Sequence, residues 1–169
     1  MSQPVMTRVA NRYDILSHIG EGGMGAVFLA VDRLTGADVA LKRVLLGVDQ
    51  LQHNASLANP TNDPLLSLAH EFRTLASLRH PNIISVLDYG FDHQLDNASP
   101  FFTMTLLKDA QDIVEAAGDH PLEVQVGLLM QMLEALAYLH QRGIVHRDLK
   151  PANVLVVDGH VYVLDFGLA

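Results

Sequence analysis

A run of closely spaced glycines between two strand-like segments constrains the fold of this chain more than any other feature. Gly20, Gly22 and Gly25 follow an extended pattern that begins at Tyr13, and residues 26–31 after them again have strand character. Glycines let backbone amides approach an anionic ligand, because no Cβ stands in the way. A dinucleotide-binding fold needs a helix after the glycines, so the strand excludes that class. A phosphate-binding hairpin and a merely flexible hairpin remain open.

Composition and charge narrow the classes of function. The 169 residues can bury a sizeable core, and 49% of them are hydrophobic. No run of eighteen apolar residues occurs, so we expect no membrane segment. The net charge of −8 disfavours nucleic-acid binding, which depends on lysine and arginine. The absence of cysteine excludes disulfides and thiolate metal sites, and it fits a cytoplasmic location.

The first half of the chain has the pattern of an antiparallel sheet with one helix. Strand-like segments punctuated by turns indicate further strands over residues 38–44, 83–89 and 101–107. Asp63 and Pro64 form a helix-start signal, and the helix that follows is expected to end near Arg79. Two polar stretches indicate loops, over residues 47–62 and 92–100.

The second half, from about Lys108, is mainly helical. Residues 122–140 predict one long helix, which is so apolar that we expect it to lie inside a larger body. Residues 154–157 and 161–164 predict the two strands of a small hairpin that turns at Asp158 and Gly159.

Lys42, one of only three lysines, is a candidate ligand for phosphate. Strand alternation places it on one face with Ala40 and Val44, where an unpaired ammonium would be costly. Glu71 follows Leu68 by three residues on the inward stripe of the predicted helix, so it is the natural partner of Lys42. The alternatives are a lysine that extends into solvent from an edge strand, and a glutamate at the wet edge of the apolar face.

Asp148, Asn153 and Asp165 follow one another at spacings that suit phosphoryl transfer. Asn153 and Asp165 offer the oxygen ligands that Mg²⁺ prefers. Asp148 could orient or deprotonate an attacking hydroxyl, and Lys150 could neutralise charge on the phosphoryl group. This chemistry depends mainly on positioning and electrostatics. The alternative, a charged loop before a hairpin, requires all of these spacings to arise by chance.

The ordered motifs resemble those of eukaryotic-type serine/threonine protein kinases, over residues 13–169 and with a bacterial wording of the glycine loop. They are the glycine loop at 20–27, Val-Ala-Leu-Lys at 39–42, His-Arg-Asp-Leu-Lys-Pro-Ala-Asn at 146–153 and Asp-Phe-Gly at 165–167. The resemblance implies an α+β fold with a five-stranded antiparallel N-lobe sheet and one main helix. It divides the chain into an extension, an N-lobe and a partial, mainly helical C-lobe over 1–12, 13–107 and 108–169. The C-lobe part would hold a helix after the hinge, the long helix, the catalytic loop and the metal motif.

The resemblance also implies a role for each site residue. Asp148 and Lys150 would be catalytic, and Asn153 and Asp165 would bind Mg²⁺. His146 and Phe166 would belong to a hydrophobic spine. The residues implied to contact ATP are Ile19, Gly20, Gly22, Gly25, Val27, Ala40, Lys42, Glu71, Met104, Thr105, Leu107 and Leu155.

The implied activity is ATP-dependent phosphorylation of serine and threonine hydroxyls in a protein substrate. The alternative is a nucleotide-binding scaffold of the pseudokinase kind, which loss of Lys42, Asp148 or Asp165 would favour; none is lost. Two departures from the family stand out: the connection at 47–62 is long, and the sequence stops two residues after Gly167. We therefore expect the chain to be the N-terminal portion of a longer kinase, with the catalytic domain truncated, inactive alone and joined to further domains in its parent.

Overall fold

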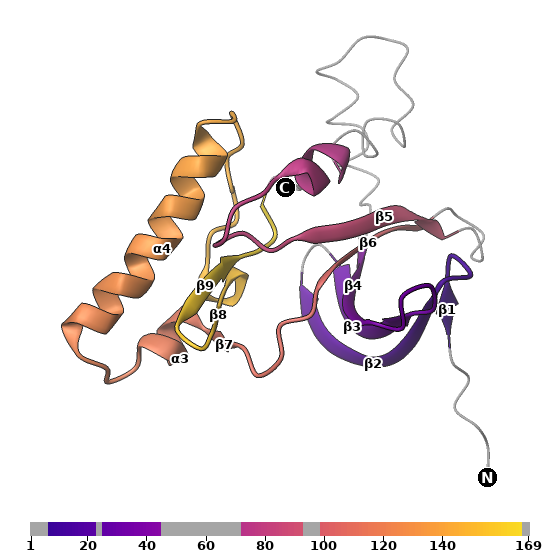
Figure 1. Cartoon of the computed structure of the whole chain (residues 1–169), viewed down its shortest axis with the longest axis horizontal. Helices are drawn as coiled ribbons and strands as arrows, with labels where there is room; N and C mark the ends of the chain where they lie inside the picture. The colour runs from indigo at the N-terminus through magenta and orange to yellow at the C-terminus, as the bar shows by residue number, and fades with distance from the viewer. Residues whose placement is uncertain (1–6, 23–24, 45–71, 93–98, 167–169) are drawn as a thin grey trace. The chain divides into compact units, whose positions relative to one another are not determined.

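The structure is a computed structural model that describes residues 7–22, 25–44, 72–92 and 99–166 (Figure 1). It divides into two compact units, one formed by Met1–Ala76 with Val86–Leu106 and the other by Ser77–Ser85 with Leu107–Ala169. The expected loop at 47–62, the expected helix start at Asp63 and the glutamate Glu71 lie outside the described residues. So does most of the expected loop at 92–100.

In the described part of the first unit, six strands form one antiparallel sheet, in the order β1-β2-β3-β4-β6-β5. This confirms the predicted antiparallel architecture. The short β1 was not predicted, because two residues carry no periodic signal; it lies in the expected N-terminal extension. The strands are β1 (Arg8–Val9), β2 (Tyr13–Gly22), β3 (Gly25–Asp32), β4 (Asp38–Val44), β5 (Val86–Asp92) and β6 (Ser99–Thr105).

The strand expected over 83–89 is displaced in the structure, where β5 occupies Val86–Asp92. Ile83 instead forms a parallel bridge with Val163, and the Ile84 amide donates to the Val163 carbonyl at 3.1 Å, both within the second unit. An apolar run predicts extended structure but does not say which sheet it joins. The strand expected over 101–107 likewise lies two residues earlier, at Ser99–Thr105.

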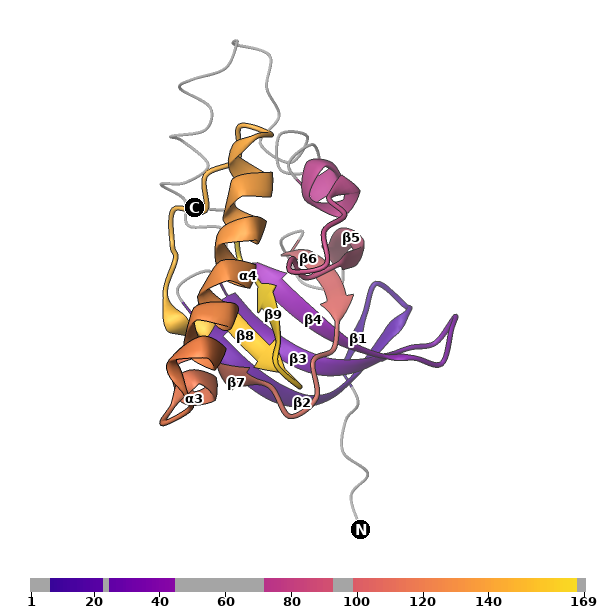
Figure 2. The ribbon, with the colours of Figure 1, turned by 60° about the vertical axis from the view of Figure 1, so that its left-hand side comes forward.

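The sheet of the first unit curls (Figure 2), and a cluster of buried hydrophobic residues forms its core. The core residues come from five strands, β1, β2, β3, β4 and β6, because alternate side chains of each strand point inward. Tyr13 and Phe101 meet edge to face, with ring centroids 5.7 Å apart. The buried members of this core are Val9, Tyr13, Ala30, Val39, Leu41 and Phe101.

A short described helix, residues 72–77, packs on the other face of this sheet. Phe72 is fully buried, and its ring lies 5.7 Å from that of Phe102 on β6 and 5.9 Å from that of Tyr89 on β5. The helix thus ends two residues before the expected end at Arg79.

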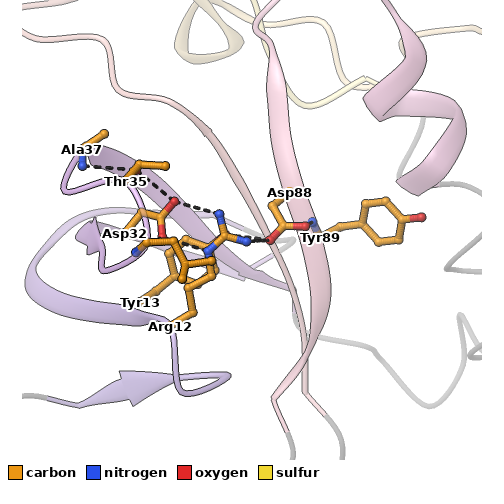
Figure 3. A network of polar contacts seen from close by, with 8 residues as sticks. Arg12, Tyr13, Asp32, Thr35, Ala37, Asp88 and Tyr89 are labelled. Atoms are coloured by element: carbon orange, nitrogen blue, oxygen red, sulfur yellow. Dashed lines mark hydrogen bonds and ion pairs between the residues drawn. The ribbon is translucent and has the colours of Figure 1, made fainter.

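Arg12 ties one edge of the curled sheet to the other (Figure 3). Its guanidinium donates to both carboxylate oxygens of Asp32, at 2.8 and 2.7 Å, and to Asp88 on the edge strand β5 at 2.7 Å. The Tyr13 hydroxyl donates to the same Asp88 oxygen at 2.7 Å. Thr35 adds a hydrogen bond to Asp32 at 3.0 Å. Charged side chains therefore link strands that are far apart in the order of the sheet.

Among its described residues, the second unit contains a three-stranded sheet and two α-helices (Figure 1). Helix α3 begins with a capping box, in which Asp112 and Glu115 bond each other's backbone amides. The hairpin β8–β9 turns at Asp158 and Gly159, whose φ values of 49° and 76° suit a tight hairpin turn. The elements are β7 (Gln111–Asp112), α3 (Ile113–Ala117), α4 (Leu122–His140), β8 (Val154–Val157) and β9 (His160–Val163).

Helix α4 has the predicted bounds, but less of it is buried than expected. Leu128, Ala135 and Leu139 form its buried stripe, whereas Met130 and Leu133 are each 57% exposed. By length and composition α4 could also cross a membrane, although core helices of soluble proteins pass the same test. The sequence contains no unbroken run of eighteen apolar residues, because glutamines and glutamates interrupt this helix. For that reason no membrane segment was expected.

Candidate functional site

The predicted nucleotide contacts of the central strands share one face of the first unit's sheet. Gly20 pairs with Val27, Val27 with Lys42, and Ala40 with Met104. Directly paired residues of antiparallel strands point to the same side. The structure thus brings these five residues together on the face opposite the hydrophobic core.

Lys42 is buried on this face, with 3% of its surface exposed. It stands between Val27 and Phe102 in the pairing of β3, β4 and β6. A buried ammonium is costly unless an anionic or polar group accompanies it. Phe72, the first described residue of the helix, contacts Phe102, which pairs with Lys42. Glu71 directly precedes Phe72 in the sequence, and this position suits the predicted partner of Lys42. The Lys42–Glu71 ion pair itself stays a prediction, because Glu71 lies outside the described residues.

The glycine loop joins β2 to β3 on the same sheet. Gly22 pairs with Gly25, whose φ of 135° is a conformation that residues with a Cβ rarely adopt. A register shift between His18 and Gly20 marks a bulge in β2, and Ile19 at this bulge is 50% exposed. Gly25 therefore has a glycine-dependent backbone, which suits close approach to an anion.

The other predicted nucleotide contacts are divided between the two units. Thr105 is the exposed last residue of β6. Leu107 belongs to the second unit, as does Leu155 on β8, which pairs with Tyr162. The structure thus groups Met104 with Ala40, and it describes Leu107 and Leu155 with the other unit.

Asp148, Lys150 and Asn153 form one hydrogen-bonded group in the second unit. The Lys150 ammonium donates to Asp148 Oδ2 at 2.7 Å. The Asn153 amide donates to the same oxygen at 3.0 Å and to the Asp148 carbonyl at 2.8 Å. Asn153 is buried at the end of a short 3₁₀ turn, Pro151–Asn153. Three residues predicted for separate roles therefore meet at one carboxylate.

These contacts keep the Asp148 carboxyl ionised. The hydrogen bond from Lys150 lowers the pKa of Asp148 below its ordinary value; partial desolvation opposes this, and the bond from Asn153 adds to it. The resulting carboxylate is a hydrogen-bond acceptor at neutral pH. It is suited to orienting a hydroxyl group by accepting its hydrogen bond, whereas the lowered pKa makes it a weaker base.

The β8–β9 hairpin brings Asn153 and the segment before Asp165 to the same end. Asn153 directly precedes β8, and the Leu164 amide donates to the Asn153 carbonyl at 2.9 Å. The His146 Nε2 atom lies 2.8 Å from the Leu164 carbonyl, and the His146 ring meets Phe166 edge to face at 6.4 Å. The two predicted Mg²⁺ ligands, Asn153 and Asp165, thus flank one open hairpin end.

Two non-glycine residues near this group have positive φ, as do four turn residues elsewhere in the described chain, Ala10, Asn11, Asp109 and Asp158. Arg147 and Asp165 have φ values of 65° and 55°, in the left-handed region that is unfavourable for residues with a side chain. Each such residue costs on the order of 1–3 kcal/mol and persists only where its surroundings impose it. Strained non-glycine residues are typical of functional sites.

One polar cluster of the second unit was missed from the sequence. Asn82 is buried, and its side-chain amide donates to Gln131 Oε1 and to the Val161 carbonyl, each at 3.0 Å. A signal was present, because Gln131 interrupts the apolar stripe of α4.

Comparison with known proteins agrees with this arrangement. Residues 13–169 match the family described as protein kinase domain. Three bacterial proteins align with 95% or more of the chain, and the name of each describes it as a serine/threonine-protein kinase. They are the DNA damage-responsive kinase RqkA of Deinococcus radiodurans (40% identical over 96% of this chain), the probable kinase SCO3848 of Streptomyces coelicolor (37% over 96%) and PrkC of Bacillus subtilis (35% over 96%).

The curled antiparallel sheet and the carboxylate–lysine–asparagine group are consistent with this family. The family match makes the assignment specific: the chain belongs to the protein kinase family. The chain spans 23% of the length of each of these three relatives.

Proposed function

We propose that the protein transfers the γ-phosphoryl group of ATP to serine or threonine hydroxyls of a protein substrate. The observation that carries this proposal is the convergence of Lys150 and Asn153 on Asp148 Oδ2, at 2.7 and 3.0 Å. It supplies an ionised acceptor beside a cation, which is what the reacting hydroxyl and the transferred group require. The names of the relatives support the same activity.

Each unit has its own part in the proposed reaction. In the first, Lys42 and the glycine loop would hold the phosphates, and Val27, Ala40 and Met104 would contact the adenine. In the second, Asn153 and Asp165 would hold Mg²⁺, which neutralises phosphate charge when bound. Asp148 would accept a hydrogen bond from the substrate hydroxyl, and Lys150 would stabilise the negative charge on the transferred group.

The test is a phosphate-transfer assay on the full-length protein with Mg-ATP and mixed serine and threonine peptides. Asp148→Asn should lower the rate by about 10³-fold, within the range for losing an acid–base group. Asp158→Asn is the matched control, because Asp158 lies at the exposed hairpin turn, where its positive φ also suits asparagine. The control should retain full activity.

Two outcomes would contradict the proposal. Equal activity of Asp148→Asn and Asp158→Asn would show that Asp148 does not take part. Thermal stabilisation by Mg-ATP without any phosphate transfer would favour the nucleotide-binding scaffold instead, since a ligand that binds the native state raises the melting temperature.

A further inference from the structure

Gln131 is a half-buried polar residue on the face of α4 that carries the buried stripe. Leu128, three residues before it, and Ala135, four residues after it, are both buried. Residues at these spacings lie on one face of a helix. A glutamine in such a stripe is costly unless its carboxamide is hydrogen-bonded. None of the motifs described above accounts for it.

The carboxamide of Gln131 joins α4 to two other segments of the second unit. Its Oε1 atom accepts hydrogen bonds from the side-chain amide of Asn82 and from the backbone amide of Val161, each at 3.0 Å. Its Nε2 atom donates to the Gly159 carbonyl at 3.0 Å. A carboxamide has two donors and two acceptor lone pairs, so three of its four capacities are used.

Asn82 fixes the other side of the hairpin. Its side chain donates to the Val161 carbonyl at 3.0 Å, and its carbonyl accepts from the Val163 amide at 2.9 Å. The His160 ring contacts the Pro81 carbonyl at 3.0 Å. The segment around Asn82 therefore runs along β9, and Gln131 bonds both of them to α4.

Leu164, the residue that follows β9, links the position of the hairpin to the candidate site. Leu164 bonds the Asn153 carbonyl through its amide, and its own carbonyl contacts His146. Asp165 comes next in the chain. A displacement of β9 along α4 would therefore move both proposed Mg²⁺ ligands.

We propose that Gln131 is a positioning residue that sets the affinity for Mg²⁺ by holding the β8–β9 hairpin on α4. The inference rests on the proposed function, because Asn153 and Asp165 matter in this way only if they bind the metal. Gln131 touches neither ligand, so its effect passes through the hairpin.

A matched pair of variants, Gln131→Met and Gln125→Met, tests the proposal. Gln125 also lies on α4 and donates to backbone carbonyls, but to those of Gly118 and His120 before the helix. ATP affinity of the full-length protein is measured by displacement of a fluorescent nucleotide, first in EDTA and then across an Mg²⁺ titration.

We expect Gln131→Met to raise about tenfold the Mg²⁺ concentration at which the effect of Mg²⁺ on ATP affinity is half-maximal. This is the low end of the effect of residues that orient metal ligands without binding the metal. Its ATP affinity in EDTA should stay unchanged, and Gln125→Met should alter neither quantity. Equal losses with and without Mg²⁺ would indicate general destabilisation and overturn the proposal. Identical Mg²⁺ dependence in the two variants would also overturn it.

Amide hydrogen exchange gives a readout that needs no nucleotide. The Leu164 amide should exchange about fivefold faster in Gln131→Met than in Gln125→Met, because its bond to Asn153 depends on the hairpin position. Equal exchange rates would overturn the positioning role. If the ATP affinity of the unsubstituted protein does not depend on Mg²⁺, the proposed function is wrong. The exchange rates of the Leu164 amide would still decide the role of Gln131.

If Gln131→Met does not fold, Gln131→Asn is the second variant. It keeps the carboxamide but is one methylene shorter, so it cannot reach all three partners. A smaller shift of Mg²⁺ dependence in the same direction is expected, and no shift would overturn the proposal.

Discussion

The guanidinium of Arg12 lies 2.7 Å from a carboxylate oxygen of Asp88, although the two residues are 76 positions apart in the sequence. Asp88 belongs to an edge strand of the six-stranded sheet, and Arg12 stands beside the strand at the opposite edge. The same guanidinium binds Asp32 through two nitrogens. One cation therefore closes the curled sheet and compensates a buried carboxylate.

Replacing Arg12 should destabilise the first unit. Arg12→Leu leaves the buried Asp32 without its cation, although the bonds from Leu34 and Thr35 remain. We expect a loss of about 2 kcal/mol in the free energy of unfolding, below the 3–5 kcal/mol of a fully buried pair because Arg12 is partly exposed. Urea denaturation measures this.

The control for that change is Arg33→Leu. Arg33 is half exposed, and its Nε atom lies 3.7 Å from Asp14. Such surface pairs contribute about 0–1 kcal/mol, so the control should unfold close to the unsubstituted protein. Equal destabilisation by both variants would contradict a special role for Arg12.

Asp32 should make stability depend on acid pH. The hydrogen bond from Arg12 is the main reason why the pKa of Asp32 lies well below its ordinary value of 3.8. A lowered carboxyl pKa stabilises the folded state above the ordinary value, and this contribution is lost as pH falls from 3.8 toward the lower folded value. Unfolding free energies between about pH 5 and 2 should therefore fall less steeply in Asp32→Asn. Parallel curves would contradict this.

Lys42→Met should abolish stabilisation by Mg-ATP without unfolding the protein. Methionine fills a similar volume, so the substitution should lower stability only by leaving the partner of the Lys42 ammonium unpaired. Thermal shift with and without Mg-ATP is the measurement. Arg43→Met is the control, because Arg43 is the next residue of β4 and points to the opposite face. A retained shift in Lys42→Met would show that Lys42 does not hold the nucleotide.

Lys150→Met should slow phosphate transfer by about 10²-fold, as expected when one preorganised charge is removed from the reacting group. It also removes the main cause of the lowered Asp148 pKa, so that pKa should rise toward its ordinary value. Transfer rates and a carboxyl NMR titration measure the two effects. Lys108→Met, at an exposed lysine outside the motifs, should change neither.

Much of the fold could be predicted from local pattern. The hairpin at Asp158 and Gly159 and the long helix Leu122–His140 were predicted because turn chemistry and helical periodicity are local signals. The placement of Ile83 beside Val163 was not, because strand propensity does not specify a pairing partner. The two-residue β1 was not predicted for a related reason, because it is a strand through its pairing with β2.

The candidate site shows the same division. Asp148, Lys150 and Asn153 stand close in the sequence, so their meeting at one carboxylate could be anticipated from spacing. The bonds from Gln131 to Asn82 and Val161 could not, because they join segments 49 and 30 residues apart. The sequence indicated only that Gln131, which interrupts an apolar stripe, needs a hydrogen-bond partner.

The pairing of Val154 with Val163 limits how this segment can change in evolution. A hairpin keeps its open ends together whatever the length of its turn, so insertions between Asp158 and Gly159 should leave Asn153 and Asp165 in place. Loss of a single residue inside either strand would reverse the faces of all residues beyond it. Length variation among descendants of this sequence should therefore concentrate at the turn and spare the strands.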